Sequence, residues 1–466
     1  PAATIRLHSY EECVRDKRAF GENFTVIETQ SNLMEPEATL VEPTGDRYVV
    51  VTPPNATLTT EELDHSFDLP YERAPHPRYR GKGDIPAWEM IKFSVNIHRG
   101  CFGGCSFCTI SAHQGKFINS RSERSILDEV RRVAAMPGFK GYLSDVGAPS
   151  ANMYRMGGRD RELCRKCRRP SCLHPARCPN LCNDHRPLLA LYEKIRAVKG
   201  IKKAFIGSGI RYDLFDGPAY LETVLKHHTS GRLKVAPEHV SDAVLSVMGK
   251  PSRAVYDRFV GEYRAMNREL GRDQYLVPYL MSSHPGSTLR EAVELAEYVR
   301  DMGYMPEQVQ DFYPTPSTMS TCMYYTGVDP RTMKPVYVPK TAHEKALQRA
   351  LIQYRKPENY ELVREALQKA GRTDLIGYGP KCLIAPVKGQ RSHGPGKRGG
   401  SKRGSGTGGQ AQGSSKQGGH DARTRSERRG SGKQSPFAQQ GKRGSNAVGR
   451  NRAGQGREAN RGGHRG

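Results

Sequence analysis

The stretch that decides the fold is Ile97-His98-Arg99-Gly100-Cys101-Phe102-Gly103-Gly104-Cys105-Ser106-Phe107-Cys108. It follows an apolar segment, residues 93–97, that is typical of a buried strand. Gly103 and Gly104 allow the backbone to turn tightly between the first two cysteines. Three thiolates with the spacing Cys-x3-Cys-x2-Cys can hold three irons of a four-iron cluster, and the fourth iron then stays open to a substrate or cofactor.

Two other interpretations of these cysteines stay open at this point. A zinc ion could be completed by a ligand from elsewhere, such as His98 or His113, because structural zinc prefers four protein ligands. The three cysteines could also be reduced thiols that only pack. The open iron–sulfur site is the interpretation that the compact spacing favours.

The region around this loop, residues 86–315, alternates between apolar strand segments and helical patterns. Ser125-x-x-Asp128 and the capping box Thr288-x-x-Glu291 are helix start signals within it. Six strand–helix units predict an α/β fold with a parallel sheet, either open or closed into a partial barrel. Right-handed crossovers bring the strand ends to one rim, where such folds build active sites, and the cysteine loop lies on that rim. The predicted strands span residues 93–97, 141–146, 203–208, 232–236, 275–281 and 308–312.

The flanking regions differ in composition from this core. Residues 1–85 contain a short helical pattern at 10–20, a strand pattern at 47–52 and a Pro-, Arg- and Gly-rich connector, and we interpret them as the end of an upstream domain plus a linker. The chain begins at Pro1, and we expect it to be a processed chain or a fragment. Residues 316–387 predict a helical extension with a helix hairpin at 342–354 and 359–370. Residues 388–466 are rich in Gly, Ser, Arg and Lys, and we expect this tail to be disordered.

The net charge of +25 is concentrated in the tail, which carries 19 Lys and Arg against 3 Asp and Glu. Residues 1–387 therefore carry only +9, and the charge gives no strong argument for nucleic-acid binding by the core. No stretch approaches 18 consecutive apolar residues, and no signal peptide pattern is visible. Eleven cysteines without secretory features predict reduced thiols and a cytoplasmic location.

A second cysteine set follows the second predicted strand. Five cysteines lie within a short connection, interleaved with His174 and His185 and surrounded by basic residues that favour thiolates. The set fits a tetrahedral zinc site, an auxiliary iron–sulfur cluster, or a reduced loop that holds no metal. We interpret the other cysteines as isolated, inert thiols. The set comprises Cys164, Cys167, Cys172, Cys178 and Cys182; the isolated cysteines are Cys13, Cys322 and Cys382.

The cysteine motif after the first strand of a six-unit α/β domain resembles radical S-adenosylmethionine (SAM) enzymes. The longer string His98-Arg-Gly-Cys-Phe-Gly-Gly-Cys-Ser-Phe-Cys-Thr-Ile-Ser-Ala-His-Gln-Gly-Lys116 is similar to the YgiQ-type branch of that superfamily. Further matching strings are Ser144-Asp-Val-Gly-Ala-Pro-Ser-Ala-Asn-Met-Tyr154, Val235-Ala-Pro-Glu-His239 and Asp311-Phe-Tyr-Pro-Thr-Pro-Ser-Thr-Met319. The resemblance covers residues 60–387, and it implies that most of an N-terminal domain of this branch is missing here.

The resemblance implies a partial (β/α)6 barrel with a [4Fe–4S] cluster on Cys101, Cys105 and Cys108. SAM would occupy the open iron and be cleaved by one electron to a 5′-deoxyadenosyl radical. It also implies that residues on the rim contact SAM, and that Gly147-Ala148-Pro149 holds its amino group through backbone carbonyls; the family has a second glycine where this chain has Ala148. The implied SAM contacts are Phe107, Gly147, Pro149, Ser208, Arg211 and Glu238.

For Gly147 a plain strand-end turn stays open as an alternative, and for Arg211 a structural ion pair with Asp213. Glu238 and the adjacent His239 could likewise be a structural pair. The partners implied for the enzyme are SAM and an electron donor such as flavodoxin or ferredoxin, with no membrane. The resemblance leaves the substrate unassigned.

A hypothesis of a different class is a zinc-containing RNA-binding protein without radical catalysis. The second cysteine set and the Arg- and Gly-rich tail support it, because such tails contact phosphates without sequence preference. The tail could equally be a flexible segment without a set partner. Metal content separates the two hypotheses, since zinc gives a colourless protein and iron–sulfur clusters a brown one.

Overall fold

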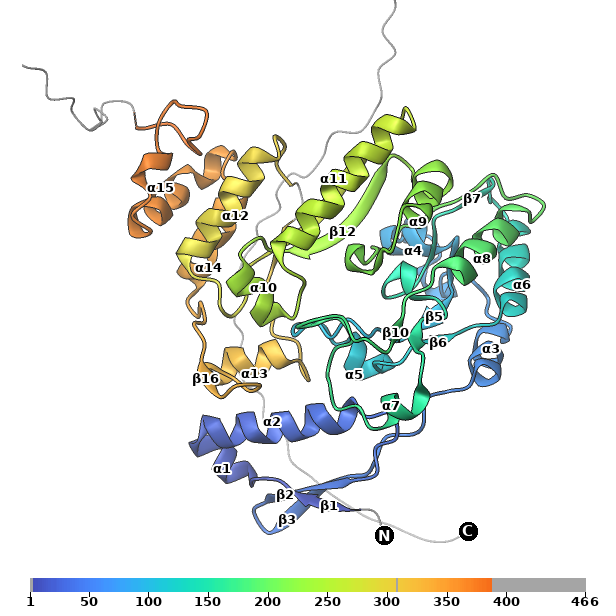
Figure 1. Cartoon of the computed structure of the whole chain (residues 1–466), viewed down its shortest axis with the longest axis horizontal. Helices are drawn as coiled ribbons and strands as arrows, with labels where there is room; N and C mark the ends of the chain where they lie inside the picture. Colours follow the sequence, from blue (N-terminus) through green and yellow to red (C-terminus); the bar gives the residue numbers. More distant parts are fainter. Residues whose placement is uncertain (1–2, 307–308, 388–466) are drawn as a thin grey trace, which may run out of the picture. The chain divides into compact units, whose positions relative to one another are not determined.

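The computed structural model describes residues 3–306 and 309–387 of the chain. The predicted disordered tail, residues 388–466, lies outside the described residues, as do residues 307–308 of the last predicted strand. Strands occur in all of the predicted strand regions, and Figure 1 labels β7 and β12 among them. They are β4 (Ser94–Asn96), β7 (Tyr142–Leu143), β8 (Asp145–Gly147), β11 (Lys203–Ala204), β12 (Arg232–Glu238), β13 (Tyr275–Ser282) and β14 (Gln310–Asp311).

These strand regions pair in parallel, each with the next along the chain. β4 pairs with β8, β7 with β11, β12 with β13 and β13 with β14. A parallel bridge between Ile210 and Val235 joins the region after β11 to β12. The predicted α/β class with parallel pairing is therefore confirmed. Among the strands of the described residues, no closed barrel forms.

Helices between the strands bury their apolar faces against them. α6 (Glu123–Ala134) buries Ile126, Val130 and Val133 completely, and they join Val95 and Ile97 in the largest core cluster. Each such side chain contributes about 1.5–3 kcal/mol through burial. The other α-helices of this region are α5 (Ile110–Gln114), α7 (Arg161–Arg165), α8 (Arg186–Arg196), α9 (Ala219–Thr223), α10 (Asp242–Met248), α11 (Arg253–Glu269) and α12 (Leu289–Asp301).

One of the two predicted helix starts is confirmed, and the other is wrong. The capping box of Thr288 and Glu291 is present at the start of α12. The prediction that Ser125 begins a helix is wrong, because α6 starts earlier and Ser122 is its N-cap. Ser125 lies buried inside the helix, and its hydroxyl donates to Asp68 at 2.8 Å. Both position 122 and position 125 carry a serine. The hydrogen bond of Ser125 to Asp68, in another helix, leaves Ser122 as the N-cap of α6.

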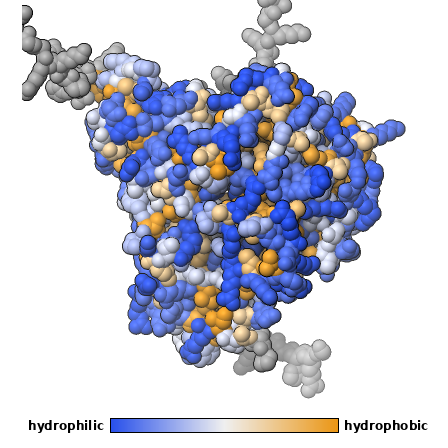
Figure 2. Space-filling model, viewed as in Figure 1, coloured by the Kyte–Doolittle hydropathy of each residue, from blue (hydrophilic) through white to orange (hydrophobic). Residues whose placement is uncertain are grey.

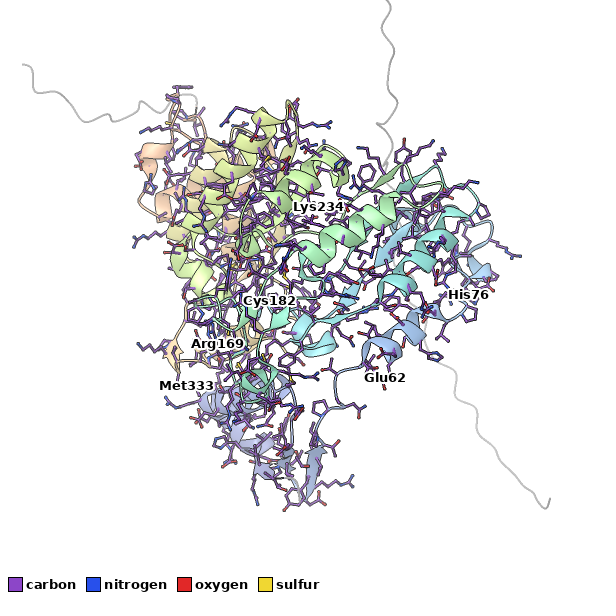
Figure 3. The ribbon with its side chains drawn as sticks, turned by 45° about the vertical axis from the view of Figure 1, so that its right-hand side comes forward. Glu62, His76, Arg169, Cys182, Lys234 and Met333 are labelled. Atoms are coloured by element: carbon purple, nitrogen blue, oxygen red, sulfur yellow. The ribbon has the colours of Figure 1, made fainter. Side chains whose placement is uncertain are left out.

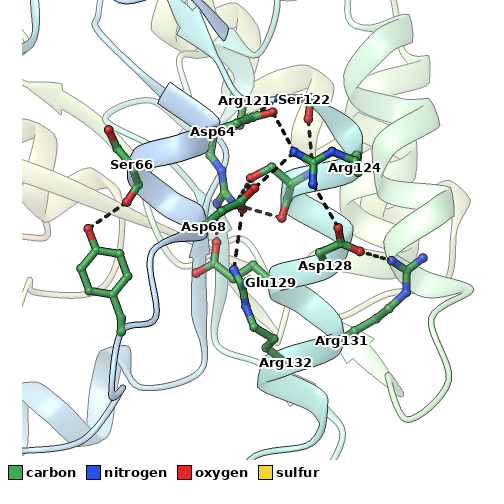
Figure 4. Close-up of polar contacts among 12 residues, drawn as sticks. Asp64, Ser66, Asp68, Arg121, Ser122, Arg124, Asp128, Glu129, Arg131 and Arg132 are labelled. Atoms are coloured by element: carbon green, nitrogen blue, oxygen red, sulfur yellow. Dashed lines mark hydrogen bonds and ion pairs between the residues drawn. The ribbon is translucent and has the colours of Figure 1, made fainter. Parts of the chain in front are cut away.

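The N-terminal region is tied to the core by ion pairs between α3 (Thr60–Asp68) and α6 (Figure 4). Asp64 accepts a hydrogen bond from the Ser122 amide at 2.9 Å, and Arg124 donates to Asp68 at 3.2 Å. Buried Glu129 pairs with Arg121. The remaining elements of this region are β1 (Thr4–Arg6), α1 (Tyr10–Arg15), α2 (Lys17–Ser31), β2 (Thr39–Thr44), β3 (Arg47–Val51) and α4 (Pro86–Ile91).

The C-terminal region forms the predicted helix hairpin. α14 (Ala342–Ile352) and α15 (Tyr360–Lys369) share a core cluster with α12. α13 (Met319–Thr326) precedes them and lies next to α2 in the fold. The face seen in Figure 2 is mostly hydrophilic, with hydrophobic residues in separate patches. In the described part of the chain, no helix has the length and apolar character needed to cross a membrane.

Candidate cofactor site

The cysteine loop begins directly after β5 (His98–Arg99) and is shaped by glycines. Gly100 and Gly104 have φ angles of +86° and +60°, which side chains other than glycine rarely adopt. A Cβ atom on Gly103 would lie 2.8 Å from Nη1 of Arg211 and 3.3 Å from Sγ of Cys101. The loop therefore needs glycine at these positions, both for its turn and for the close approach of its neighbours.

Backbone hydrogen bonds fix this loop to three other segments. The Cys101 amide donates to Gly115 O at 3.1 Å, and the Ser106 amide donates to Met248 O, at the end of α10, at 2.9 Å. In return, Ser106 O accepts from the Ser320 amide of α13 at 2.8 Å. The thiols are thus positioned by regular elements far apart in the sequence.

A buried chain of polar side chains supports the same loop. The hydroxyls of Ser106 and Ser320 lie 2.8 Å apart, and Nε2 of His284 lies 2.7 Å from Ser320 Oγ. Burial lowers the pKa of His284 to about 3, so the ring is neutral at pH 7. Phe107 packs edge-on against this ring with centroids 5.8 Å apart. Phe107, expected at the cofactor, thus contacts the apolar cluster formed by Val244, Met248, Met281 and Phe312.

The three loop cysteines are half-buried and free. Burial raises the pKa of Cys101, and it raises that of Cys108 to about 12, with Cys105 acting in the same direction. Among the described residues, no group of three Cys, His, Asp or Glu side chains is arranged to hold a metal ion. Three thiolates along one loop are the ligand set of a four-iron cluster with one open iron, in which each thiolate binds a separate iron.

Arg211 forms the main polar contact of the loop. Its Nε and Nη2 donate to the two carboxylate oxygens of Asp213 at 2.8 and 2.6 Å. Its Nη1 lies 3.4 Å from Sγ of Cys105. Burial alone would lower the pKa of Arg211, but the charge of Asp213 holds it well above its usual value. The structure thus brings Arg211 to the cysteine loop while pairing it with Asp213, the alternative that the sequence had left open.

Lys250 and Glu238 are two further buried charged residues beside the loop. Lys250 is 5% exposed and lies within electrostatic reach of Cys101 and Cys108. Glu238 has a φ of +68°, and its Oε2 is buried without a hydrogen-bond partner among the described residues. Burial raises the pKa of Glu238, and Lys250 and Arg211 offset this only in part. An unpaired buried oxygen is costly, so this oxygen is suited to accept a hydrogen bond from a ligand.

The turn after β8 packs tightly against the end of the next strand region. A Cβ on Gly147 would lie 1.9 Å from Oγ of Ser208, so only glycine fits. Asp145 accepts hydrogen bonds from the Gly207 amide at 2.7 Å and the Ser208 amide at 3.0 Å. Gly147 O accepts from the Ile97 amide at 3.0 Å and is thus part of the sheet. Ala148 is buried, and Pro149 and Ser208 are half-buried.

Other predicted residues lie outside this arrangement. His98 is buried, and its Nε2 lies 3.0 Å from Ser150 O. Burial lowers the pKa of His98 to about 4, so the neutral ring is a hydrogen-bond partner of the backbone. Cys13 and Cys322 are buried, and Cys382 is half-buried. The second cysteine set, in contrast, contacts the first loop, because the Cys172 amide donates to Phe102 O at 3.0 Å.

A cleft of about 460 Å³ lies beside the Arg211–Asp213 pair. Asp213 and Lys250 line it together with Arg177 and Arg258. Arg177 donates to Asp213 O at 2.7 Å, so Asp213 joins the wall of the cleft to Arg211.

Residues 1–94 match the family described as "Radical SAM N-terminal", and residues 307–457 match a domain of unknown function, DUF3362. A UPF0313 protein of Methanocella arvoryzae is 52% identical over 395 residues, 84% of this chain and 65% of that protein. A UPF0313 protein of Bacteroides thetaiotaomicron is 51% identical over 81% of this chain and 62% of its own length. The chain belongs to the UPF0313 proteins of the radical SAM superfamily. It spans 65% or less of the length of these two relatives.

Two solved structures of the radical SAM methyltransferase TsrM from Kitasatospora setae are also similar. One, with tryptophan and a SAM analogue bound, shares 14% identity over 47% of this chain and 35% of that chain, with a TM-score of 0.29. The other, with cobalamin and a [4Fe–4S] cluster bound, shares 12% identity over 59% of this chain and 61% of that chain, with a TM-score of 0.34. Similarity at this level does not define a shared fold.

Several residues that support the cysteine loop were not predicted from the sequence. Ser320 and His284 reach it from the C-terminal half of the core, and Lys250 reaches it from the end of α10. Asn152 bonds the backbone of Arg211 twice, accepting from its amide at 2.8 Å and donating to its carbonyl at 2.9 Å. Asn152 lies within one of the strings that resemble the superfamily branch, and that string was the only available signal.

Proposed function

We propose that the chain is a radical SAM enzyme whose substrate is still to be assigned. A [4Fe–4S] cluster on Cys101, Cys105 and Cys108 would, with SAM on its open iron, supply one-electron cleavage of SAM to methionine and a 5′-deoxyadenosyl radical. The observation that carries the proposal is the set of three thiols on one anchored loop, with the Arg211 guanidinium 3.4 Å from Cys105 Sγ. An N–H donor and a buried cation at a ligand sulfur stabilise a negatively charged cluster.

The chain's own residues would bind and orient SAM at this loop. The unpaired oxygen of Glu238 suits a hydroxyl or amino donor, and Ser208 adds a half-buried hydroxyl on the same rim. Gly147 and Pro149 would form the floor, with Gly147 keeping the approach to Ser208 open. Phe107 would exclude water from one side of the loop, because it packs into an apolar cluster.

The strand regions would together form a partial (β/α)6 barrel around this site. Consecutive parallel pairing from β4 to β14 supports that arrangement. The domain limits would be 86–315 for this core, 316–387 for the helical extension and 1–85 for the preceding segment. An electron donor such as flavodoxin or ferredoxin would reduce the cluster. Contact of the tail with RNA would be nonspecific, and the tail lies outside the described residues.

Anaerobic reconstitution tests the proposal. We expect a brown protein with about four irons at this site, and release of 5′-deoxyadenosine when SAM and dithionite are added. Cys105→Ala should abolish the release. Cys382→Ala, which removes a thiol of the C-terminal segment, should leave it unchanged. Continued release from Cys105→Ala, or a colourless protein that holds zinc alone, would overturn the proposal, and the latter outcome would favour the zinc-containing RNA-binding alternative.

A further inference from the structure

The connection after β8 carries the second cysteine set and folds back on itself. β10 (Leu181–Cys182) pairs with β9 (Gly157–Gly158) in an antiparallel hairpin, and α7 (Arg161–Arg165) lies between them. Arg169 and Cys182, labelled in Figure 3, lie in this connection. The hairpin closes residues 157–182 into one loop, so cysteines up to 14 positions apart, from Cys164 to Cys178, are brought together.

Four of the five cysteines are close neighbours of one another in this loop. The Cys178 amide donates to Cys172 O at 2.8 Å, and the Cys167 amide donates to Cys164 O at 3.2 Å. Cys172 and Cys178 pack on the same apolar cluster, and Cys164 and Cys167 lie within electrostatic range of Cys172. Cys182 follows them on β10, where it is paired with Gly157.

A side-chain amide donates a hydrogen bond to one of these four thiols, as it would to a thiolate sulfur. Asn180 Nδ2 donates to Cys164 Sγ at 3.4 Å, and the same side chain bonds the Asp160 amide and carbonyl at 2.8 Å each. A Cβ on Gly158 would lie 2.2 Å from Cys164 Sγ. Glycine at 158 therefore leaves room for a sulfur that Asn180 holds in place.

A buried cation reaches the loop from outside it. Lys116 is 2% exposed, and its Nζ donates to Arg169 O at 2.7 Å. It lies within electrostatic range of Cys164 and Cys172, and also of the half-buried Glu28. Burying a lysine costs free energy unless negative charge offsets it, and four thiolates holding a metal centre would add to the charge that Glu28 supplies.

This loop is joined to the first cysteine loop along a shared seam. The Ser171 hydroxyl donates to Gly103 O at 2.7 Å, and the Cys172 amide donates to Phe102 O at 3.0 Å. A Cβ on Gly104 would lie 2.6 Å from the Cβ of Ser171. Cys101 packs on the same apolar cluster as Cys172 and Cys178. A centre held by the second loop would thus lie directly beside the first.

We propose that Cys164, Cys167, Cys172 and Cys178 hold a second iron–sulfur cluster next to the cysteine loop of the first. Zinc has no redox chemistry. An iron–sulfur cluster takes its four thiolates on separate irons and can exchange electrons with a neighbouring cluster, and the seam places this loop directly beside the first. The site uses none of the ligands of the first cluster, so it stands whether or not SAM is cleaved there.

Selective removal of the first site tests this proposal on the full chain, purified without oxygen. In the triple variant Cys101→Ala, Cys105→Ala, Cys108→Ala we expect about four irons and four sulfides per chain to remain, compared with about eight in the parent protein. The remaining cluster should give its own Mössbauer and reduced-state EPR spectra. Cys182→Ser is the matched control, and it should keep the full iron content because Cys182 is not one of the four proposed ligands.

The reverse variant, with all four loop cysteines changed to Ala, should lose about half of the iron and keep the spectrum of the first cluster. Circular dichroism shows whether each variant is folded. If this variant does not fold, the iron content of the triple variant and of the parent still shows whether a second cluster is present. Three results would contradict the proposal of a second cluster. They are a folded triple variant without iron, a triple variant with one zinc per chain, and a parent protein with about four irons. Loss of SAM cleavage with about four irons retained would leave it intact.

Discussion

The two cysteine loops differ in what holds them in place. The first, residues 100–108, is fixed by backbone hydrogen bonds to Gly115, to the end of α10 and to α13. The second, residues 157–182, is closed by the β9–β10 hairpin and by Asn180, and Lys116, Arg177 and its seam with the first loop bond it to the rest of the chain. Backbone hydrogen bonds therefore position the first loop, whereas largely side-chain hydrogen bonds tie the second to its surroundings.

The loops also differ in the cations that face them. Arg211 and Lys250 act on the first loop, and Arg211 is itself neutralised by Asp213. Lys116 acts on the second, where its Nζ donates to Arg169 O, and Glu28 is its nearby carboxylate. The cation of the first loop is thus held in a direct ion pair, whereas the cation of the second bonds a backbone carbonyl.

Breaking the ion pair gives the largest expected effect. Arg211→Met leaves the buried Asp213 carboxylate without its partner, and we expect the free energy of unfolding to fall by about 3–5 kcal/mol. Urea denaturation measures the change. The double variant Arg211→Met, Asp213→Asn removes the unpaired charge and should recover part of the loss. A single variant as stable as the parent would mean that the pair does not support the first loop.

The seam between the loops is tested by Gly104→Ala. Gly104 has a φ of +60° and its Cβ would clash with Ser171, so we expect a loss of about 2–4 kcal/mol from backbone strain and overpacking together. Gly45→Ala is the matched control, because its φ of +58° is nearly the same and nothing lies within 4 Å of its Cβ. That variant should lose only about 1 kcal/mol. Equal losses would show that the seam is not tightly packed.

Acid should weaken the fold around both loops through their buried histidines. Burial lowers the pKa of His284 to about 3 and that of His185, next to the second loop, to about 4, while an unfolded histidine titrates near 6.5. The unfolded state therefore binds more protons between these values, and stability is lost as pH falls below about 6.5, by about 1.4 kcal/mol per pH unit and group. His284→Gln should flatten this slope, measured by urea denaturation between pH 7 and 5. An unchanged slope would show that His284 is protonated in the folded state.

The sequence could predict what depends on local pattern and could not predict what depends on long-range packing. Alternation of apolar segments located the strand regions, and the spacing of Cys101, Cys105 and Cys108 located the loop. The cap at Ser122 in place of Ser125 depends on Asp68, which belongs to another helix. Ser320 is more than 200 positions from Ser106, and no periodicity connects them. The pairing of Cys182 with Gly157 in the hairpin of β9 and β10 likewise joins positions that no local pattern connects.

Asn180→Ala gives the smallest and most local expected effect. Asn180 is half-buried and bonds Asp160 and Cys164, so its loss should cost about 1 kcal/mol and act on the second loop alone. Hydrogen exchange should rise in residues 159–182 and stay unchanged in residues 100–108, since the latter are fixed by α10 and α13. Asn359→Ala removes a comparable side chain-to-backbone bond in the C-terminal region and should change neither loop. Equal increases in both loops would show that the first loop also relies on the second, and that the fold alone does not position it.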